Sequence, residues 1–377
     1  MKYLTQYIET YGNLNFEEKE FNEIDALVFS QLAYIDYKDI IDESSKAYIS
    51  DAAMKFFLLH SDEAIENMIG ISQKAATLLK ECAKSRRFSE VRICNYVNNV
   101  NDEIDKQFSA VNFILPGGHL VVAYRGTDIT VTGVKESAML SYMFPVPAQI
   151  EALYYFQETG LRSTGKITLC GHSKGGNLAV FAGVNCANSM KKRIENIYEF
   201  DAPGFPKWFF ERYDFQEIKD RIHLITPQSS IIGRLLFHDS TPEIVHSDAS
   251  SGLKQHSVST WEILGDKFVY EEAYDSSSDL MNKYFNNLLD YIGEDDQELF
   301  YNTLEYLANE MGIKDYNDLK GFDIRRAITL INSLTTLNDE QKERFNKILK
   351  TLTSDFAKEY LAKRAKNYFR KKKTEDD

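Results

Sequence analysis

Residues 167–179 read ITLCGHSKGGNLA, and this stretch decides the fold. Its first four residues have the composition of a buried strand, a glycine-rich turn follows, and residues 177–190 have helical composition. Within the turn, Gly171-His172-Ser173-Lys174-Gly175 has the pattern of a nucleophile elbow, where small neighbours allow a sharp change of direction. Such a turn presents the serine hydroxyl at a helix N-terminus, whose partial positive charge favours an oxyanion. We therefore expect Ser173 to be the nucleophile of a serine hydrolase.

Strands and helices alternate on both sides of this turn. A helix is expected at residues 148–159, and strand composition recurs at residues 91–97, 108–115, 120–124, 197–200 and 222–226. This alternation is typical of a parallel sheet whose two faces are covered by helices. The sequence therefore predicts an α/β fold of the α/β-hydrolase type, with a mostly parallel central sheet.

Helical patterns flank this alternating region. Apolar residues at helical spacing mark residues 21–87, and they return from about residue 279 onward, for example at Ile324, Ala327, Ile328 and Ile331. We expect three parts. Residues 1–90 form a helical region packed on the core, residues 91–275 form the α/β-hydrolase catalytic core, and residues 276–377 form a helical extension with a basic tail.

Acyl transfer requires an oxyanion hole beside the nucleophile. One N–H group comes from the residue after the serine, here Lys174, and a second comes from a loop after an earlier strand. Residues 121–128 read VVAYRGTD, an apolar strand that ends in a polar turn with a glycine. Thr127 is the expected second donor.

A general base must take the proton of the serine, because a serine hydroxyl is a weak nucleophile on its own. Three of the seven histidines, His238, His246 and His256, follow the last expected core strand. His256 lies after a loop rich in Ser, Gly and Asp and is the favoured base. The sequence neighbours of His246 have strand composition, so His246 is expected to lie on a strand. His172 is expected to pack within the elbow.

The acid of the triad would fix the histidine tautomer and stabilise the imidazolium ion. Asp201 directly follows the strand at 197–200 and opens the rigid turn Ala202-Pro203-Gly204, at the same sheet edge as Ser173. Asp239 follows the next strand and its extension, and is the competing candidate. The sequence favours Asp201.

Composition excludes some function classes. The 44 Lys and Arg residues against 57 Asp and Glu residues give a net charge of −13, which argues against a general nucleic-acid binder.

The four cysteines show neither CxxC pairing nor metal-like spacing with histidine, so no metal or cofactor is expected. Together with an N-terminus that lacks a signal-peptide pattern, they favour a reducing cytoplasm. The oligomeric state is left open.

The basic run at residues 363–373 has two interpretations. Nine of its eleven residues are Lys, Arg or aromatic, a composition that suits contact with an anionic lipid surface. A solvated helix end is the alternative. No stretch of transmembrane length is free of charge.

Residues 124–128 and 171–179 resemble the class 3 lipase-like branch of the α/β-hydrolases, and more closely the bacterial family DUF2974, also labelled Mbeg1-like. Supporting segments lie at residues 21–34, 107–110, 227–233 and 255–256, so the resemblance spans roughly residues 16–264. It implies a carboxylic ester hydrolase that acts on lipid-like or acylglycerol substrates. Thioesters, peptide bonds and acyl transfer would use the same machinery.

Two departures from the lipase pattern affect the assignment. Class 3 lipases usually place the acid after the strand that corresponds to residues 222–226, where this chain has Gln228-Ser229-Ser230-Ile231 without a carboxylate. Residues 200–204, FDAPG, are instead similar to the acid turn of pancreatic-type lipases, which strengthens Asp201. Lys174 stands where lipases commonly carry leucine. It is either a cation beside the nucleophile that favours anionic acyl or phospholipid groups, or a solvent-facing helix residue.

Two function classes follow from these observations. The first is an ester hydrolase in which Ser173 attacks, His256 carries the proton and Asp201 orients the histidine. The second is a catalytically inactive α/β-hydrolase-like protein that serves as a binding module or scaffold. The missing carboxylate after residues 222–226 supports the second class, whereas the intact elbow and the late histidine support the first.

Overall fold

The structure, a computed structural model, describes residues 1–41, 46–68, 71–127, 139–250, 252–276, 324–335 and 337–347, with a few isolated positions between 133 and 311. The chain divides into two compact units. The first comprises Met1–Thr127 and Phe144–Tyr274, and the second comprises Asp128–Met143 and Asp275–Asp377. The first unit contains both the N-terminal helices and the sheet. The expected division at residues 90 and 275 stays a prediction.

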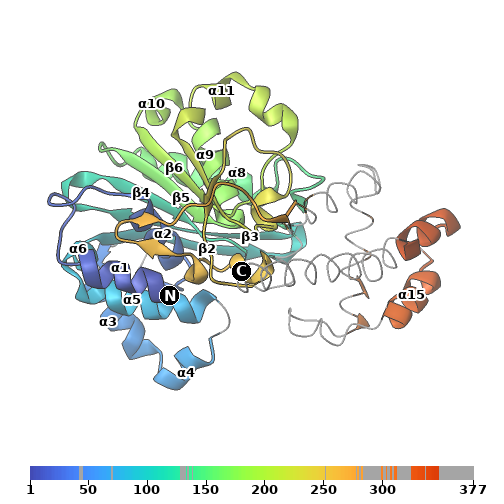
Figure 1. Cartoon of the computed structure of the whole chain (residues 1–377), viewed down its shortest axis with the longest axis horizontal. Helices are drawn as coiled ribbons and strands as arrows, with labels where there is room; N and C mark the ends of the chain where they lie inside the picture. The colour runs from blue at the N-terminus through green and yellow to red at the C-terminus, as the bar shows by residue number, and fades with distance from the viewer. Residues whose placement is uncertain are drawn as a thin grey trace, which may run out of the picture. The chain divides into compact units, whose positions relative to one another are not determined.

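An eight-stranded sheet forms the centre of the first unit, with its strands in sequence order (Figure 1). Strands β1 to β4 pair antiparallel, and strands β4 to β8 pair parallel. The elbow therefore lies in the parallel part, and the predicted α/β-hydrolase fold is confirmed. The strands are β1 Lys46–Tyr48, β2 Arg92–Asn101, β3 Lys106–Ile114, β4 Leu120–Tyr124, β5 Ile167–His172, β6 Ile194–Phe200, β7 Ile222–Pro227 and β8 Glu243–Val245, with a separate hairpin of β9 Ile263–Leu264 and β10 Lys267–Phe268.

Helices cover both faces of the sheet (Figure 1). Alternate residues of a strand point to opposite faces, so Val121 and Ala123 of β4 join the core with α2, whereas Val122 and Tyr124 join the core with α8 and α9. The first-unit helices are α1 Lys2–Tyr11, α2 Glu23–Leu32, α3 Ile49–Leu59, α4 Asp62–Glu66, α5 Ile71–Lys84, α6 Arg86–Ser89, α8 Pro147–Gly160, α9 Lys174–Asn185, α10 Asn188–Lys191, α11 Tyr213–Gln216 and α12 Gly252–Gln255.

The helix after the elbow differs from the sequence prediction. It was expected over residues 177–190, but α9 begins at Lys174 and ends at Asn185, and the short α10 follows. Gly175 and Gly176 were assigned to the turn, yet they lie in the first turn of the helix, which approaches the sheet closely. A Cβ on Gly175 would lie 2.2 Å from the carbonyl oxygen of Tyr124. These glycines therefore permit close packing of α9 on the sheet.

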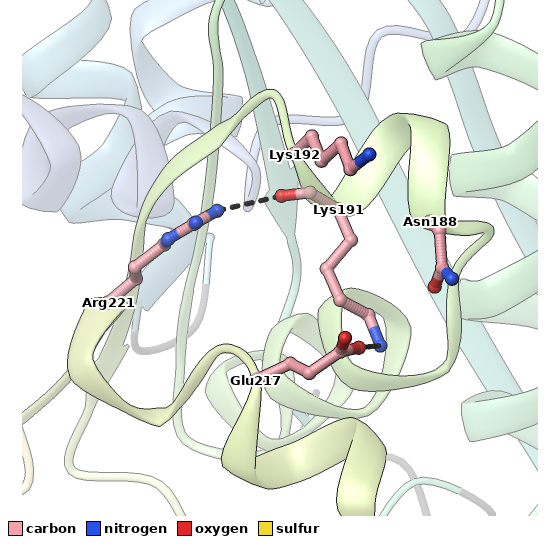
Figure 2. A pocket seen from close by; sticks show the side chains of 5 residues that line it. All are labelled: Asn188, Lys191, Lys192, Glu217 and Arg221. Atoms are coloured by element: carbon pink, nitrogen blue, oxygen red, sulfur yellow. Dashed lines mark hydrogen bonds and ion pairs between the residues drawn. The ribbon is translucent and has the colours of Figure 1, made fainter.

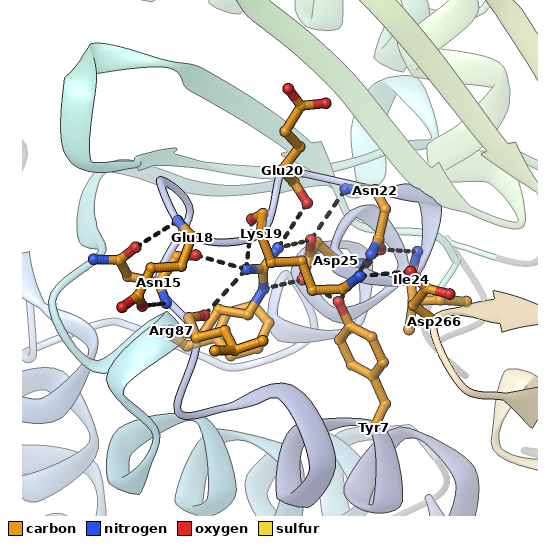
Figure 3. Close-up of polar contacts among 12 residues, drawn as sticks. Tyr7, Asn15, Glu18, Lys19, Glu20, Asn22, Ile24, Asp25, Arg87 and Asp266 are labelled. Atoms are coloured by element: carbon orange, nitrogen blue, oxygen red, sulfur yellow. Dashed lines mark hydrogen bonds and ion pairs between the residues drawn. The ribbon is translucent and has the colours of Figure 1, made fainter.

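A buried ion pair ties the N-terminal helices together (Figure 3). Asp25 in α2 accepts hydrogen bonds from Arg87 Nε at 2.8 Å and from Arg87 Nη2 at 2.5 Å, and it also accepts one from the Tyr7 hydroxyl at 2.9 Å. Both charged side chains are fully buried. Burial lowers the pKa of the Arg87 guanidinium, but the Asp25 carboxylate outweighs this effect and raises the pKa above its ordinary value.

In the second unit, helix α15 spans Ile324–Ser333. Ala327 and Ile331 are buried on one face of α15, as predicted, and pack with Leu307, Leu337 and Phe345. Most of the expected extension at residues 276–377, including the basic tail at 363–373, falls outside the described residues, so membrane contact through this tail stays a prediction. Within the described residues, no helix combines the length and the apolar character that crossing a membrane requires.

Candidate active site

Ser173 lies on a strained turn between β5 and α9. Its backbone angles, φ 60° and ψ −135°, are rare for a residue with a side chain, and such strain costs about 1–3 kcal/mol. A Cβ on Gly171 would lie 2.2 Å from the carbonyl carbon of Gly175, so the turn requires glycine there. The Ser173 N–H donates to the carbonyl oxygen of Phe200 at 2.9 Å. This bond joins the elbow to the end of β6, where Asp201 follows.

Asp201 and His256 are brought together although 55 residues separate them in the chain. The Nδ1 atom of His256 lies 2.6 Å from Oδ2 of Asp201, and the carboxylate is completely buried. The other oxygen, Oδ1, accepts hydrogen bonds from the Ser230 hydroxyl and, at 3.0 Å, from the N–H of Gly233. Asp239, the competing candidate, is exposed. The geometry therefore favours Asp201 as the partner of the histidine.

The loop that carries His256 is held by buried hydrogen bonds. The Gln255 amide accepts from the N–H of Ser229 and donates to the carbonyl of Ala249, both at 2.8 Å. The Trp261 indole donates to the carbonyl of Gln255 at 2.7 Å. These contacts fix the backbone, while 22% of the His256 side chain stays exposed. No local pattern in the sequence indicates this role for Gln255 or Trp261.

The other candidate histidines occupy different positions. His172 is fully buried, and its ring centroid lies 4.5 Å from that of His256. The Nδ1 atom of His246 lies 2.7 Å from a Glu271 carboxylate oxygen. His238 lies 3.9 Å from Glu199. Among these residues, His256 is the histidine hydrogen-bonded to Asp201.

The turn after β4 lies against the nucleophile. A Cβ on Gly126 would lie 3.1 Å from the Cβ of Ser173, and Thr127 follows directly. Lys174 is the first residue of α9, and N–H groups in the first turn have no partner inside the helix. Of the two predicted oxyanion donors, Lys174 directly follows Ser173, and Thr127 directly follows Gly126, which lies against Ser173.

The Lys174 side chain corrects one interpretation. It is 1% exposed, so the solvent-facing alternative is wrong. Its ammonium group donates to the Gln107 backbone carbonyl at 2.7 Å and to the Gln107 side-chain oxygen at 2.8 Å. Gln107 belongs to β3, 67 residues earlier in the chain. These interior acceptors compensate in part for the cost of burying the cation.

Glu199, two residues before Asp201, is a second buried carboxyl group that the sequence analysis missed. Burial raises the pKa of Glu199 well above its ordinary value, and burial lowers the pKa of His238 to about 4. Burial therefore favours the uncharged form of both groups. The 3.9 Å between them is longer than a hydrogen bond. Their only sequence signal is polarity beside apolar strand residues.

One group of described side chains has metal-ligand spacing. The ligand atoms of His246, Asp248 and Glu262 lie within 4.8 Å of one another, so these residues could hold a divalent cation. Their side chains are 35%, 52% and 37% exposed, respectively. Carboxylates this exposed need no ion to remain stable in water.

Figure 2 shows a small cavity. It lies near the N-terminal ends of the parallel strands, at the sheet edge opposite to that of Ser173 and Asp201. Its lining residues precede β6 and β7, whereas Ser173 and Asp201 follow the C-terminal ends of β5 and β6. The volume of about 170 Å³ is smaller than the 300–1,000 Å³ of typical ligand pockets. This cavity is therefore separate from the candidate active site. It is lined by Asn188, Lys191, Lys192, Glu217 and Arg221.

Comparison with known proteins bears on the family. The Mbeg1-like family model matches residues 82–305, more than half of the chain, which confirms the family predicted from the sequence. No curated protein sequence matches the chain. Among solved structures, M37 lipase is 18% identical with a TM-score of 0.36, covering 57% of this chain and 70% of its own. Rhizomucor miehei lipase, in its native propeptide complex, is 10% identical with a TM-score of 0.37, covering 68% and 76%. Likenesses at this level carry no argument about substrate.

Proposed function

The chain belongs to the Mbeg1-like family, and from the geometry around Ser173 we propose that it is a serine hydrolase that cleaves carboxylic esters. One observation carries the proposal. The buried Asp201 carboxylate lies 2.6 Å from Nδ1 of His256, whose ring centroid is 4.5 Å from that of His172, the residue that precedes Ser173 on the strained strand-to-helix turn. A hydrogen-bonded carboxylate and imidazole next to a serine is the arrangement that activates a hydroxyl for attack on a carbonyl.

The proposed reaction assigns one step to each of these residues. Ser173 Oγ attacks the ester carbonyl carbon, and His256 Nε2 takes the hydroxyl proton as the new C–O bond forms. The carbonyl oxygen becomes an oxyanion, for which the N–H groups of Thr127 and Lys174 are the proposed donors. The intermediate collapses, and the alcohol leaves with the proton from His256. Water then attacks the acyl-enzyme with the same base, which releases the acid and restores Ser173.

Asp201 acts through His256 in this proposal. Because its Oδ2 accepts a hydrogen bond from Nδ1, it holds the proton on Nδ1 and leaves the lone pair on Nε2. When His256 takes the serine proton, the buried carboxylate stabilises the imidazolium ion. The hydrogen bonds from Ser230 and Gly233 fix the carboxylate in place without adding a second permanent charge.

Lipid-like or acylglycerol esters are the proposed substrates, because the motifs resemble those of class 3 lipases. A catalytically inactive binding protein or scaffold is a weaker alternative. Its support is the missing carboxylate after residues 222–226, and Asp201, which follows the neighbouring strand, supplies a carboxylate instead. A cytoplasmic location is also proposed. All four cysteines are buried and free, which suits a reducing compartment.

Hydrolysis of p-nitrophenyl esters, with acyl chains from acetyl to palmitoyl, tests the function. The wild-type chain is expected to hydrolyse at least one ester, and Ser173→Ala to lose at least about 10³-fold in rate because the nucleophile is gone. Ser240→Ala, a change of another partly buried serine, is the control and keeps the wild-type rate. Equal hydrolysis by wild type and Ser173→Ala would rule out Ser173 as nucleophile.

A further inference from the structure

His172, the residue before the nucleophile, is a buried histidine with a hydrogen bond at each ring nitrogen. Its Nε2 atom lies 2.8 Å from the backbone carbonyl oxygen of His256, and its Nδ1 atom lies 3.0 Å from the hydroxyl of Tyr34. Tyr34 follows α2 in the N-terminal region, so three distant segments meet at this ring. The proposed reaction does not use the His172 ring as acid or base.

The protons in this chain of contacts can be assigned. A carbonyl oxygen only accepts, so Nε2 of His172 carries the hydrogen that is donated to His256. Burial lowers the pKa of His172 to about 3, so the ring is neutral near pH 7 and Nδ1 has no proton. The Tyr34 hydroxyl is therefore the donor to Nδ1. This bond holds His172 in the tautomer that binds the His256 carbonyl.

His256 is consequently held at two points. Its backbone carbonyl is held by His172, and its Nδ1 is held by Asp201. The two histidine rings also contact each other in a tilted arrangement, with centroids 4.5 Å apart and an angle of 33° between their planes. Since a displacement of about 1 Å in a catalytic group can cost about 10²-fold in rate, these restraints bear directly on proton transfer.

Tyr34 and His172 also contact the turn after β4. A Cβ on Gly126 would lie 2.3 Å from the Tyr34 hydroxyl and 2.4 Å from the carbonyl oxygen of His172. The same Cβ would lie 3.1 Å from that of Ser173. The side chain of Tyr34 and the elbow therefore limit where the Gly126-Thr127 backbone can lie, and with it one proposed oxyanion donor.

We propose that Tyr34 and His172 are positioning residues that set His256 and the Gly126-Thr127 turn against Ser173. The inference rests on the proposed ester hydrolysis. It makes the segment that follows α2 part of the catalytic support, so the N-terminal region does more than cover the sheet. Neither residue touches the reacting atoms in this account.

Kinetics of the full chain, with a p-nitrophenyl ester and a fluorophosphonate, test the inference. His172→Leu is expected to lower kcat about 100-fold with KM within about twofold, because both hydrogen bonds are lost. Tyr34→Phe is expected to lower kcat about tenfold. His172→Gln, whose side-chain amide can still donate to the His256 carbonyl, recovers most of the rate. The fluorophosphonate end point stays at one label per chain in each variant, while its rate falls.

A matched control separates positioning from general stability. His119 is a partly buried histidine, which contacts Thr168 through Nε2 at 2.9 Å near the start of β4 and β5. His119→Gln is expected to keep kcat. Unchanged kcat in both Tyr34→Phe and His172→Leu, or a fall in kcat that only matches a lowered labelling end point, would overturn the positioning role. Absence of hydrolysis and of labelling in the wild type would instead remove the proposed function, and the inference with it.

Discussion

Asp25 and Asp201 are both completely buried carboxylates in the first unit, but their negative charges are compensated in different ways. Asp25 meets the permanent charge of Arg87 through two hydrogen bonds. Asp201 meets His256 and two uncharged donors, and among the described residues its ion-pair contacts involve only that histidine. A guanidinium is always charged, whereas an imidazole becomes a cation only when it takes up a proton.

The two carboxylates should therefore contribute to different properties. The Asp25 charge is cancelled in the resting molecule, and Arg87 also donates to four backbone carbonyls of the segment before α2, so this pair fixes architecture. The Asp201 charge is matched fully only when His256 is protonated, which in the proposed reaction occurs as the serine attacks. An interaction that strengthens in the transition state raises the rate. The comparison predicts that Asp25 determines stability and Asp201 determines activity.

Replacement of the acid tests the catalytic half with the largest expected effect. Asp201→Asn is expected to lower kcat about 10⁴-fold, because an amide does not stabilise the imidazolium and favours the wrong tautomer. Steady-state hydrolysis of a p-nitrophenyl ester measures the loss. Asp239→Asn is the matched control and should keep the wild-type rate. A loss below tenfold for Asp201→Asn, or a comparable loss for Asp239→Asn, would reverse the assignment of the acid.

Removal of the cation tests the structural half. Arg87→Met leaves Asp25 buried without its counter-ion, so the free energy of unfolding is expected to fall by about 3–5 kcal/mol. Urea denaturation measures this change, while kcat per folded molecule stays the same. The double variant Asp25→Leu with Arg87→Met should recover most of the loss, because no charge is then left unpaired. A loss below about 1 kcal/mol in Arg87→Met would contradict the account.

Removing one hydroxyl that donates a hydrogen bond to each carboxylate gives the smallest expected effects. Tyr7→Phe removes a donor to Asp25 and is expected to lower the free energy of unfolding by about 1.5–3 kcal/mol without changing kcat. Ser230→Ala removes a donor to Asp201 and is expected to lower kcat roughly tenfold. Urea denaturation and ester hydrolysis are measured on both. The comparison fails if Tyr7→Phe changes kcat more than Ser230→Ala does.

The elbow and the alternation of strands and helices were predictable, because both depend on residues that are close together in the sequence. The sequence favours Asp201 over Asp239 but does not decide between them, since each follows a strand whose C-terminal end lies at the same sheet edge. The path of the chain after β7 decides between them. It brings the Ser230 hydroxyl and the Gly233 N–H to Asp201 and leaves Asp239 exposed.

Other features depend on contacts between distant segments, which no local pattern reports. Arg87 reaches Asp25 across 62 residues, and Lys174 reaches Gln107 across 67. Lys174 looks like a surface residue in sequence, because lysine is seldom buried without a partner. Its acceptors lie on a strand of the antiparallel half of the sheet. The burial of this side chain could therefore be found only from the tertiary structure.

Covalent labelling tests the central claim, that Ser173 is an activated nucleophile, most directly. The wild-type chain and Ser173→Ala are treated with a fluorophosphonate near pH 7, and the modified residue is located by peptide mass spectrometry. The account predicts one label per chain on Ser173, no label on Ser173→Ala, and no label on wild type unfolded in urea. Labelling of a different residue, equal labelling of Ser173→Ala, or an unlabelled wild-type chain with and without detergent would contradict it.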